Sequence, residues 1–266
     1  MRLKKYQLAQ NSIYGIEALL INKDELEPIL MPEQLRDEIP TLNKMGYMKI
    51  DLDKYTAEFI KYAADFKEPV LEIGCAYGFI VRKVLEAGVR IVASDLSHEH
   101  LISLLKQIKG EYLKNLYLYP GRFPNEISFP ASSLRAVLAS RVLHFINGDD
   151  IELGLDKINN WLIDGGKFYF IAMSPYHKSI DEQFLPQYEQ NVRNNVRWPG
   201  EIENQWKIAP QHKDYVQPYL HVFDIPLLNQ LLPKHGFRID KIDYFTYVGD
   251  TTGGEQGHVG LIATKV

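Results

Sequence analysis

The chain has 266 residues, a formal net charge of −4 and a pI near 6.1; 45% of its residues are hydrophobic and 24% are charged. This composition is ordinary for a folded globular protein and gives no sign of disorder. A slightly acidic chain has no bulk basic field that could hold a phosphate backbone, so we expect no nucleic-acid partner.

The cysteine count and the hydropathy of the sequence exclude further kinds of protein. Cys75 is the single cysteine, which excludes an internal disulfide and a cysteine-based metal cluster. The apolar stretch from Ile16 to Ile21 is interrupted by Glu17 and is too short for a signal peptide or a membrane span. We therefore expect a cytoplasmic protein with no membrane partner.

Residues 1–50 contain three prolines, and apolar residues recur at helical spacing between Ile13 and Leu20. This pattern predicts an N-terminal cap made of short helices. A longer helix should begin after Asp53, whose side chain can accept hydrogen bonds from the first helical amides, and should lead into a core over 51–173.

Residues 70–95 combine a strand, a glycine-bearing turn, a helix and a second strand that ends in an acidic residue. The apolar run 70–73 is typical of a strand buried in a parallel sheet. Gly74 and Gly78 bracket the turn, where glycine permits unusual backbone conformations and leaves room for a ligand against the main chain. Asp95 ends the second strand, where a carboxylate can accept both hydroxyls of a ribose. The unit predicts a nucleotide-binding site.

The pattern Glu-x-Gly-x-x-x-Gly over 72–78, followed by Asp95, resembles the first two motifs of the class I S-adenosylmethionine-dependent methyltransferases. That family usually has a glycine where Ala76 stands. The dinucleotide fingerprint G-x-G-x-x-G would need glycines at the positions of Ala76 and Phe79, so a nicotinamide cofactor is the weaker interpretation. Two glycines that merely let a helix pack on a strand would not explain Asp95.

The loop and strand over 121–140 resemble the family's third and fourth motifs. The acidic residue that accepts the adenine amino group in the family is replaced by Arg122, unless Asn125 or Glu126 takes its place through a shifted loop. Backbone contacts at Phe123 are the other way to hold the adenine.

The remaining elements alternate between helices and strands until residue 173. The resemblance implies a Rossmann-like methyltransferase fold, α/β, with a mostly parallel seven-stranded sheet flanked by helices. Residues 174–223 then form an aromatic, proline-containing insertion after the fifth strand, and a segment this long inside a compact domain is usually functional. We interpret it as a cover over the substrate, and a packed subdomain or dimer surface explains it equally well. A last helix and an antiparallel strand hairpin over 224–266 complete a single domain.

The resemblance implies S-adenosylmethionine as cofactor and S-adenosylhomocysteine as product. Asp95 is expected to serve the ribose, the helix start after Gly78 to face the carboxylate, and Glu72 to lie beneath the ammonium. The expected cofactor-binding residues are Glu72, Gly74, Cys75, Ala76, Gly78, Asp95, Leu96, Phe123, Ser140 and Tyr47.

Candidate substrate residues and a candidate base come from the strand ends, the N-terminal segment and the insertion. A base is needed only if the acceptor loses a proton, and His144, soon after the fourth strand, is the best placed. A structural role remains the alternative for each histidine, and His98 and His100, in the first turn of a helix, are expected to face solvent. The expected substrate-binding residues are Arg141, Tyr14, Tyr176, His177 and His221.

We interpret the protein as a methyltransferase for a small molecule, with oxygen as the expected accepting atom. Alignment of the two reactants and exclusion of water can supply most of the rate. The sequence has no H-E-x-x-H or paired-cysteine pattern, so we expect no metal. A protein methyltransferase and a catalytically inactive cofactor-binding regulator stay open as alternatives.

Overall fold

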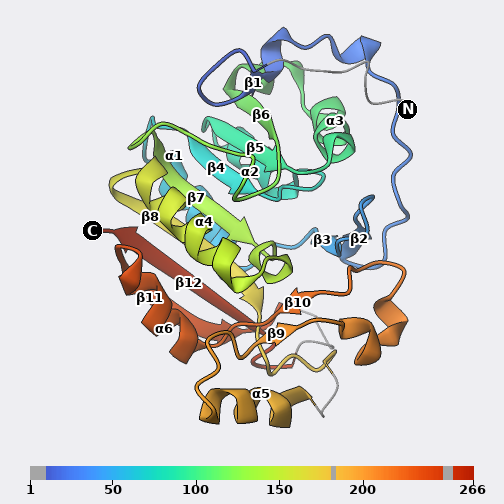
Figure 1. Ribbon diagram of the computed structural model, residues 1–266. Helices are drawn as coiled ribbons and strands as arrows, with labels where there is room; N and C mark the ends of the chain where they lie inside the picture. Colours follow the sequence, from blue (N-terminus) through green and yellow to red (C-terminus); the bar gives the residue numbers. More distant parts are fainter. Residues whose placement is uncertain (1–9, 181–183, 248–253) are drawn as a thin grey trace.

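The computed structural model describes residues 10–180, 184–247 and 254–266. Within these ranges the central feature is a mixed sheet in the order β1-β6-β5-β4-β7-β8-β12-β11 (Figure 1). Its strands are β1 (Ile16–Glu17), β4 (Val70–Ile73), β5 (Ile91–Asp95), β6 (Leu116–Pro120), β7 (Leu134–Ser140), β8 (Leu162–Met173), β11 (Phe237–Phe245) and β12 (His258–Lys265). Parallel pairing joins β6, β5, β4, β7 and β8, whereas β12 and β11 form an antiparallel hairpin at one edge.

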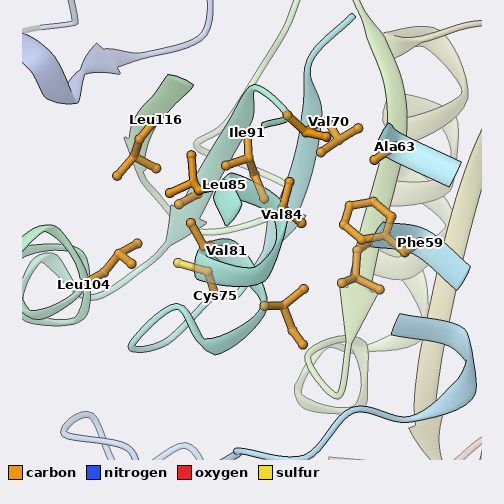
Figure 2. Close-up of a cluster of buried hydrophobic side chains, with 14 of the residues drawn as sticks. Phe59, Ala63, Val70, Cys75, Val81, Val84, Leu85, Ile91, Leu104 and Leu116 are labelled. Atoms are coloured by element: carbon orange, nitrogen blue, oxygen red, sulfur yellow. The ribbon is translucent and has the colours of Figure 1, made fainter. Parts of the chain in front are cut away.

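Among the described residues, five helices cover the two faces of this sheet: α1 (Lys54–Ala64), α2 (Phe79–Glu86), α3 (His98–Gln107), α4 (Gly148–Trp161) and α6 (Ile225–Lys234). A further helix, α5 (Phe184–Arg193), lies apart from the sheet (Figure 1). One face packs against α1, α2 and α3 through a cluster that includes Phe59, Val84 and Leu104 (Figure 2). The opposite face packs against α4 and α6. The expected Rossmann-like methyltransferase fold is confirmed, and β1, antiparallel to β6, adds a strand to the seven that were expected.

Polar N-caps fix where the helices around the site begin. The Oδ1 of Asp53 accepts hydrogen bonds from the amides of Tyr55 and Thr56 at 2.8 and 2.9 Å, at the start of α1. Ser97 and Asp224 cap α3 and α6 in the same way. Such caps satisfy amides that have no partner inside the helix. They hold the helix starts next to the carboxyl ends of the strands.

The N-terminal segment is not the helical cap that the apolar spacing predicted. Its described part, 10–50, contains two 3₁₀ turns (Ala18–Leu20 and Lys23–Glu25), β1, and the hairpin strands β2 (Glu38–Pro40) and β3 (Tyr47–Lys49). Of the predicted stripe, Ile16 is buried because it pairs with Leu118 at the sheet edge, whereas Ile13 is 60% exposed. The prediction was wrong because apolar residues spaced for a helix face also suit a short edge strand between turns.

The insertion after the fifth core strand contains α5 and the paired strands β9 (Glu201–Ile202) and β10 (Leu220–His221). It has a small core of its own, formed by Ile180, Phe184, Tyr188, Ile202, Leu220 and Val222. The insertion meets the β2–β3 hairpin, where the amide of Gly46 donates to the carbonyl of Tyr215 at 2.9 Å (Figure 1). None of the described helices is long and apolar enough to cross a membrane.

Candidate functional site

A pocket lies at the carboxyl ends of β4, β5 and β7, where the strand order reverses between β4 and β7. Ligands of open α/β sheets bind at such a reversal. All but one of the expected cofactor-binding residues line this pocket: Tyr47, Glu72, Gly74, Cys75, Ala76, Asp95, Leu96, Phe123 and Ser140. We call it the cofactor pocket.

The turn after β4 owes its shape to left-handed backbone positions. Gly74 has φ +69°, and a Cβ there would lie 2.6 Å from Cγ2 of Val142. Ala76, at the position of the family's usual glycine, has φ 45°. Gly78, the expected residue outside the pocket lining, has φ +73°, and a Cβ there would lie 2.2 Å from Cδ1 of Leu104. Gly78 therefore lets α3 pack closely against the start of α2, and it does not make room for a ligand.

Asp95 is buried at the end of β5 and is held by three donors. Its Oδ2 accepts from the amide of Ala76 at 2.8 Å, and its Oδ1 accepts from the amide of Ser97 at 2.8 Å and from Nδ1 of His100 at 3.0 Å. A carboxylate offers about four acceptor positions, so Asp95 keeps capacity for a ligand hydroxyl.

His100 is 1% exposed, which corrects the expectation that it faces solvent. The amide of Leu42 donates to its Nε2 at 3.2 Å and also to the hydroxyl of Tyr77 at 2.9 Å. Because Nε2 accepts, the proton lies on Nδ1 and is donated to Asp95. The N-terminal segment covers the first turn of α3 and is joined to Asp95 through this ring.

Glu72 is the second carboxylate of the cofactor pocket, and it lies on β4. Burial, and secondarily the charge of Asp95, raise its pKa to about 8 against an ordinary value of 4.5, although a hydrogen bond from the amide of Val81 acts in the opposite direction. Its Oε2 is buried without a hydrogen-bond partner. An unpartnered buried carboxylate oxygen fits the ammonium of the methionine part, as Asp95 fits a ribose, so the residues of this pocket fit S-adenosylmethionine.

The expected acidic partner for the adenine does not line the pocket. Glu126 instead accepts from the amide of Arg122 at 2.8 Å, and Asn125 donates to Asp150 at 3.1 Å. Arg122 and Phe123 themselves line this side of the pocket. This side of the pocket is therefore lined by Arg122 and Phe123, and the loop is not shifted so as to bring in Asn125 or Glu126.

A second cavity of about 430 Å³ adjoins the cofactor pocket, and we call it the acceptor cavity. The two share the lining residues Tyr47, Lys49, Arg141 and Phe145. Its other walls come from the 3₁₀ turn Leu143–Phe145, from β12 and from the insertion.

His144 lines this acceptor cavity and is buried. Burial, and then the charge of Arg141, lower the pKa of His144 to about 3, so the ring is neutral near pH 7. Its Nδ1 has no hydrogen-bond partner. A neutral ring with a free nitrogen at a cavity wall can accept a hydrogen bond from a ligand.

The expected substrate residues divide into two groups. Arg141 and His177 line the acceptor cavity. Tyr14 lies outside both pockets, where its hydroxyl donates to the carbonyl of Ser133, just before β7 and at the other end of the strand from the site. Its ring packs edge-on against Tyr117.

Tyr176 and His221 also lie outside the acceptor cavity. The ring of Tyr176 packs edge-on against Tyr244, with centroids 5.3 Å apart. His221 is fully buried and stacks on Phe223, and burial lowers its pKa to about 4. Both rings belong to the packing between the insertion and the core.

Several pocket residues were not expected from the sequence: Lys49, Asp51, Asp53, His100 and Tyr247. Two carboxylates just before α1 were a usable signal, because the start of the helix preceding the first core strand faces the carboxyl ends of the strands. The role of Asp53 as the N-cap of α1 already explained why an aspartate stands there, so it was not predicted as a ligand contact. The sequence carried no comparable signal for Tyr247.

Comparisons with known proteins agree with this geometry. Residues 70–166 match a family model described as a methyltransferase domain. A phosphoethanolamine N-methyltransferase of wheat, Triticum aestivum, is 25% identical over 115 residues, which are 43% of this chain and span only 23% of the wheat protein.

Solved structures share the fold. A methyltransferase of Methanosarcina mazei has a TM-score of 0.59 at 16% identity, with 81% of this chain and 99% of that chain covered. The 1,6-didemethyltoxoflavin N1-methyltransferase of Burkholderia thailandensis, with bound 1,6-didemethyltoxoflavin and S-adenosylhomocysteine, has a TM-score of 0.56 at 15% identity, with 80% of this chain and 77% of that chain covered. Residues 70–166 thus match a methyltransferase domain, and the chain as described has the fold of S-adenosylmethionine-dependent methyltransferases, with a pocket whose residues fit that cofactor.

Proposed function

We propose that the protein transfers a methyl group from S-adenosylmethionine to a small molecule bound in the acceptor cavity. The observation that carries this proposal is the junction of the two pockets at Tyr47, Lys49, Arg141 and Phe145. A cavity of about 430 Å³ lies in the range of small-ligand sites. A protein methyltransferase would instead need an open surface on which a partner could lie.

The insertion supports this proposal as a cover. Its Ile202, Ile208 and Leu220 line the acceptor cavity, and its Tyr215 accepts from Gly46 of the β2–β3 hairpin. Both segments thus close the same side of the site. A partly apolar cavity that is covered on one side limits the access of water and keeps an acceptor aligned, which is most of what methyl transfer requires.

When bound, S-adenosylmethionine would supply an electrophilic methyl group whose leaving group is its cationic sulfur. The lone pair of the acceptor would bond to the methyl carbon, and the sulfur would leave as the neutral thioether of S-adenosylhomocysteine. Asp95 would hold the ribose and Glu72 the ammonium of the cofactor at the carboxyl edge of the sheet. Burial raises the pKa of Tyr47 to about 12, so its hydroxyl remains a donor at the junction of the pockets. The neutral His144 can accept a proton from the acceptor, although a pKa near 3 makes it a weak base in the free protein.

Oxygen is the first accepting atom to test, and an amine is the second. A weakly basic His144 suits an amine, because a neutral amine attacks without losing a proton first. The wheat relative and the Burkholderia structure are also N-methyltransferases by name.

The test begins with calorimetric titration of S-adenosylmethionine and S-adenosylhomocysteine, with NAD and ATP as controls. We expect only the two adenosyl ligands to bind, and Asp95→Ala to abolish their binding. The protein is then incubated with cofactor carrying a labelled methyl group and with the small-molecule and macromolecular fractions of a cell extract. Label in the small-molecule fraction supports the proposal. Label in protein would favour the protein methyltransferase, and cofactor binding without labelled product would favour the inactive regulator.

A further inference from the structure

We propose that the acceptor carries an oxyanion, a carboxylate or a phosphate, that pairs with the guanidinium of Arg141. The inference rests on the proposed function, because it places that group in the acceptor cavity beside the cofactor pocket.

Arg141 is fixed at the junction of the pockets by an unusual backbone. It directly follows β7 and has φ 55°, which is rare for a residue with a side chain. Its amide donates to the carbonyl of Ile171 on β8 at 2.7 Å. Strain of this kind persists where the surrounding structure imposes it, commonly at ligand sites. Here it holds a half-buried guanidinium on the wall that both pockets share.

The guanidinium has no acidic partner in the part of the chain that the structure describes. Its Nε is buried without a hydrogen bond, and the ring of Tyr247 lies 5.4 Å from the guanidinium carbon. The planar guanidinium is suited to bidentate pairing with a carboxylate or phosphate. Since a partly desolvated cation without a counter-charge is unfavourable, a ligand anion is the partner that this position lacks.

The other charged residues around the acceptor cavity do not supply the counter-charge that Arg141 lacks. Lys49 also lines the acceptor cavity, but it already pairs with Asp37 at 2.8 Å and Glu38 at 3.0 Å. Lys178, exposed at the edge of the cavity, adds a second cation for which the described residues provide no ion pair. Glu38, the carboxylate in the lining of this cavity, is engaged by Lys49. The cavity therefore has an excess of positive charge on the side of Arg141.

The carboxylate of the cofactor has another binding position. The first residues of α2, Phe79 and Ile80, line the cofactor pocket, and the amides at the start of a helix favour an anion. The cofactor pocket also has the carboxylates Glu72, Asp95 and Asp51 in its lining, together with the cation Arg122. Arg141 is thus the cation that faces the acceptor, and α2 serves the cofactor.

Anion binding at Arg141 would also act on His144. The positive charge of Arg141 is one of the causes of the low pKa of His144, after burial. An anion that neutralises this charge makes the ring more basic when the acceptor is in place. The acceptor would then help to activate its own base.

The experiment uses the full chain saturated with S-adenosylhomocysteine and measures by calorimetry the binding of inorganic phosphate, benzoate and the neutral benzamide. The variants are Arg141→Met, Arg141→Lys and the control Arg197→Met, which removes an exposed arginine paired with Asp149 and Glu152. We expect phosphate or benzoate to bind the wild type at least about tenfold more tightly than Arg141→Met, with Arg141→Lys in between. Arg197→Met and the affinity for S-adenosylhomocysteine should be unchanged.

Each other outcome is informative. Equal oxyanion affinity in wild type and Arg141→Met, or no oxyanion binding to the wild type, overturns the inference and leaves the proposed function intact. A tenfold loss of S-adenosylhomocysteine binding in Arg141→Met would assign the guanidinium to the cofactor carboxylate and also overturn it. A wild type that does not bind S-adenosylhomocysteine refutes the proposed function itself. If Arg141→Met does not fold, Arg141→Lys decides, because it keeps the charge but loses the bidentate geometry.

Discussion

The replacement Glu72→Gln tests whether a buried carboxylate is kept beneath the cofactor pocket at the expense of stability. The pKa of Glu72 is about 8 in the folded protein and near 4.5 in the unfolded chain. The contribution of this group to the free energy of unfolding is therefore fully present below pH 4.5, and it is lost as the pH rises to about 8. At 1.36 kcal/mol per pKa unit, the loss amounts to about 5 kcal/mol. A glutamine has no proton to lose, so the variant should escape this loss.

The assay is urea unfolding of the cofactor-free protein at several pH values between 5 and 9. We expect the free energy of unfolding of Glu72→Gln to exceed that of the wild type by an amount that grows to about 5 kcal/mol at the alkaline end. Glu86→Gln on α2, whose side chain is 53% exposed, is the matched control and should show no such trend. A difference between Glu72→Gln and wild type that stays constant with pH would refute the reasoning.

The same carboxylate should report cofactor binding. At pH 7 most of Glu72 is protonated, and pairing with the cofactor's ammonium requires the ionised form. Calorimetry in two buffers of different ionisation enthalpy should therefore detect release of about one proton per bound cofactor by the wild type and none by Glu72→Gln. Equal proton release by the two proteins would mean that the ammonium does not meet Glu72.

Four further changes test the site. Asp95→Asn removes the charge but keeps an acceptor, and calorimetry should show an affinity for S-adenosylhomocysteine lower by about tenfold or more. Gly78→Ala forces a side chain onto a left-handed position against α3, and thermal unfolding should show a loss of about 2–4 kcal/mol. His144→Asn should not change the shape of the pH profile of kcat/KM near pH 6.5, because the pKa of His144 is about 3 in the free protein and its ring does not titrate there. His100→Phe keeps a ring but removes both hydrogen bonds, and it should weaken cofactor binding about tenfold, while His98→Phe on the exposed side of the same turn should not.

The core of this fold was predictable because local and tertiary preferences agree there. The apolar runs 70–73 and 134–140 form strands that are largely buried on both faces of the sheet, as their composition predicts. The turn between β4 and α2 contains residues with positive φ, which its glycines tolerate. Residues 10–50 gave no such agreement. Their short apolar groups suited a helix face, but Ile16 gained more by pairing with the sheet edge, a contact between segments that are about a hundred residues apart in sequence.

Within the site, the residues that could be predicted are those attached to strand ends, such as Asp95 and Arg141. His100 was misjudged for a different reason. Its place in the first turn of α3 predicts exposure when the helix is considered alone, but a hairpin from the N-terminal segment covers that turn. Sequence periodicity describes one element at a time and contains no information on which distant segment covers it.

The same hairpin links the two pockets physically. The amide of Leu42 donates a hydrogen bond to His100, which in turn contacts Asp95 of the cofactor pocket, and the amide of Gly46, four residues on, donates to the carbonyl of Tyr215 in the insertion. Tyr47 then lines both pockets. A ligand that bridges to Asp95 stabilises the Leu42 end of the hairpin, and through Gly46 it also stabilises the wall of the acceptor cavity. The contacts thus favour a complete acceptor cavity when the cofactor is bound, so we expect cofactor and acceptor to bind with positive cooperativity and the cofactor to bind first.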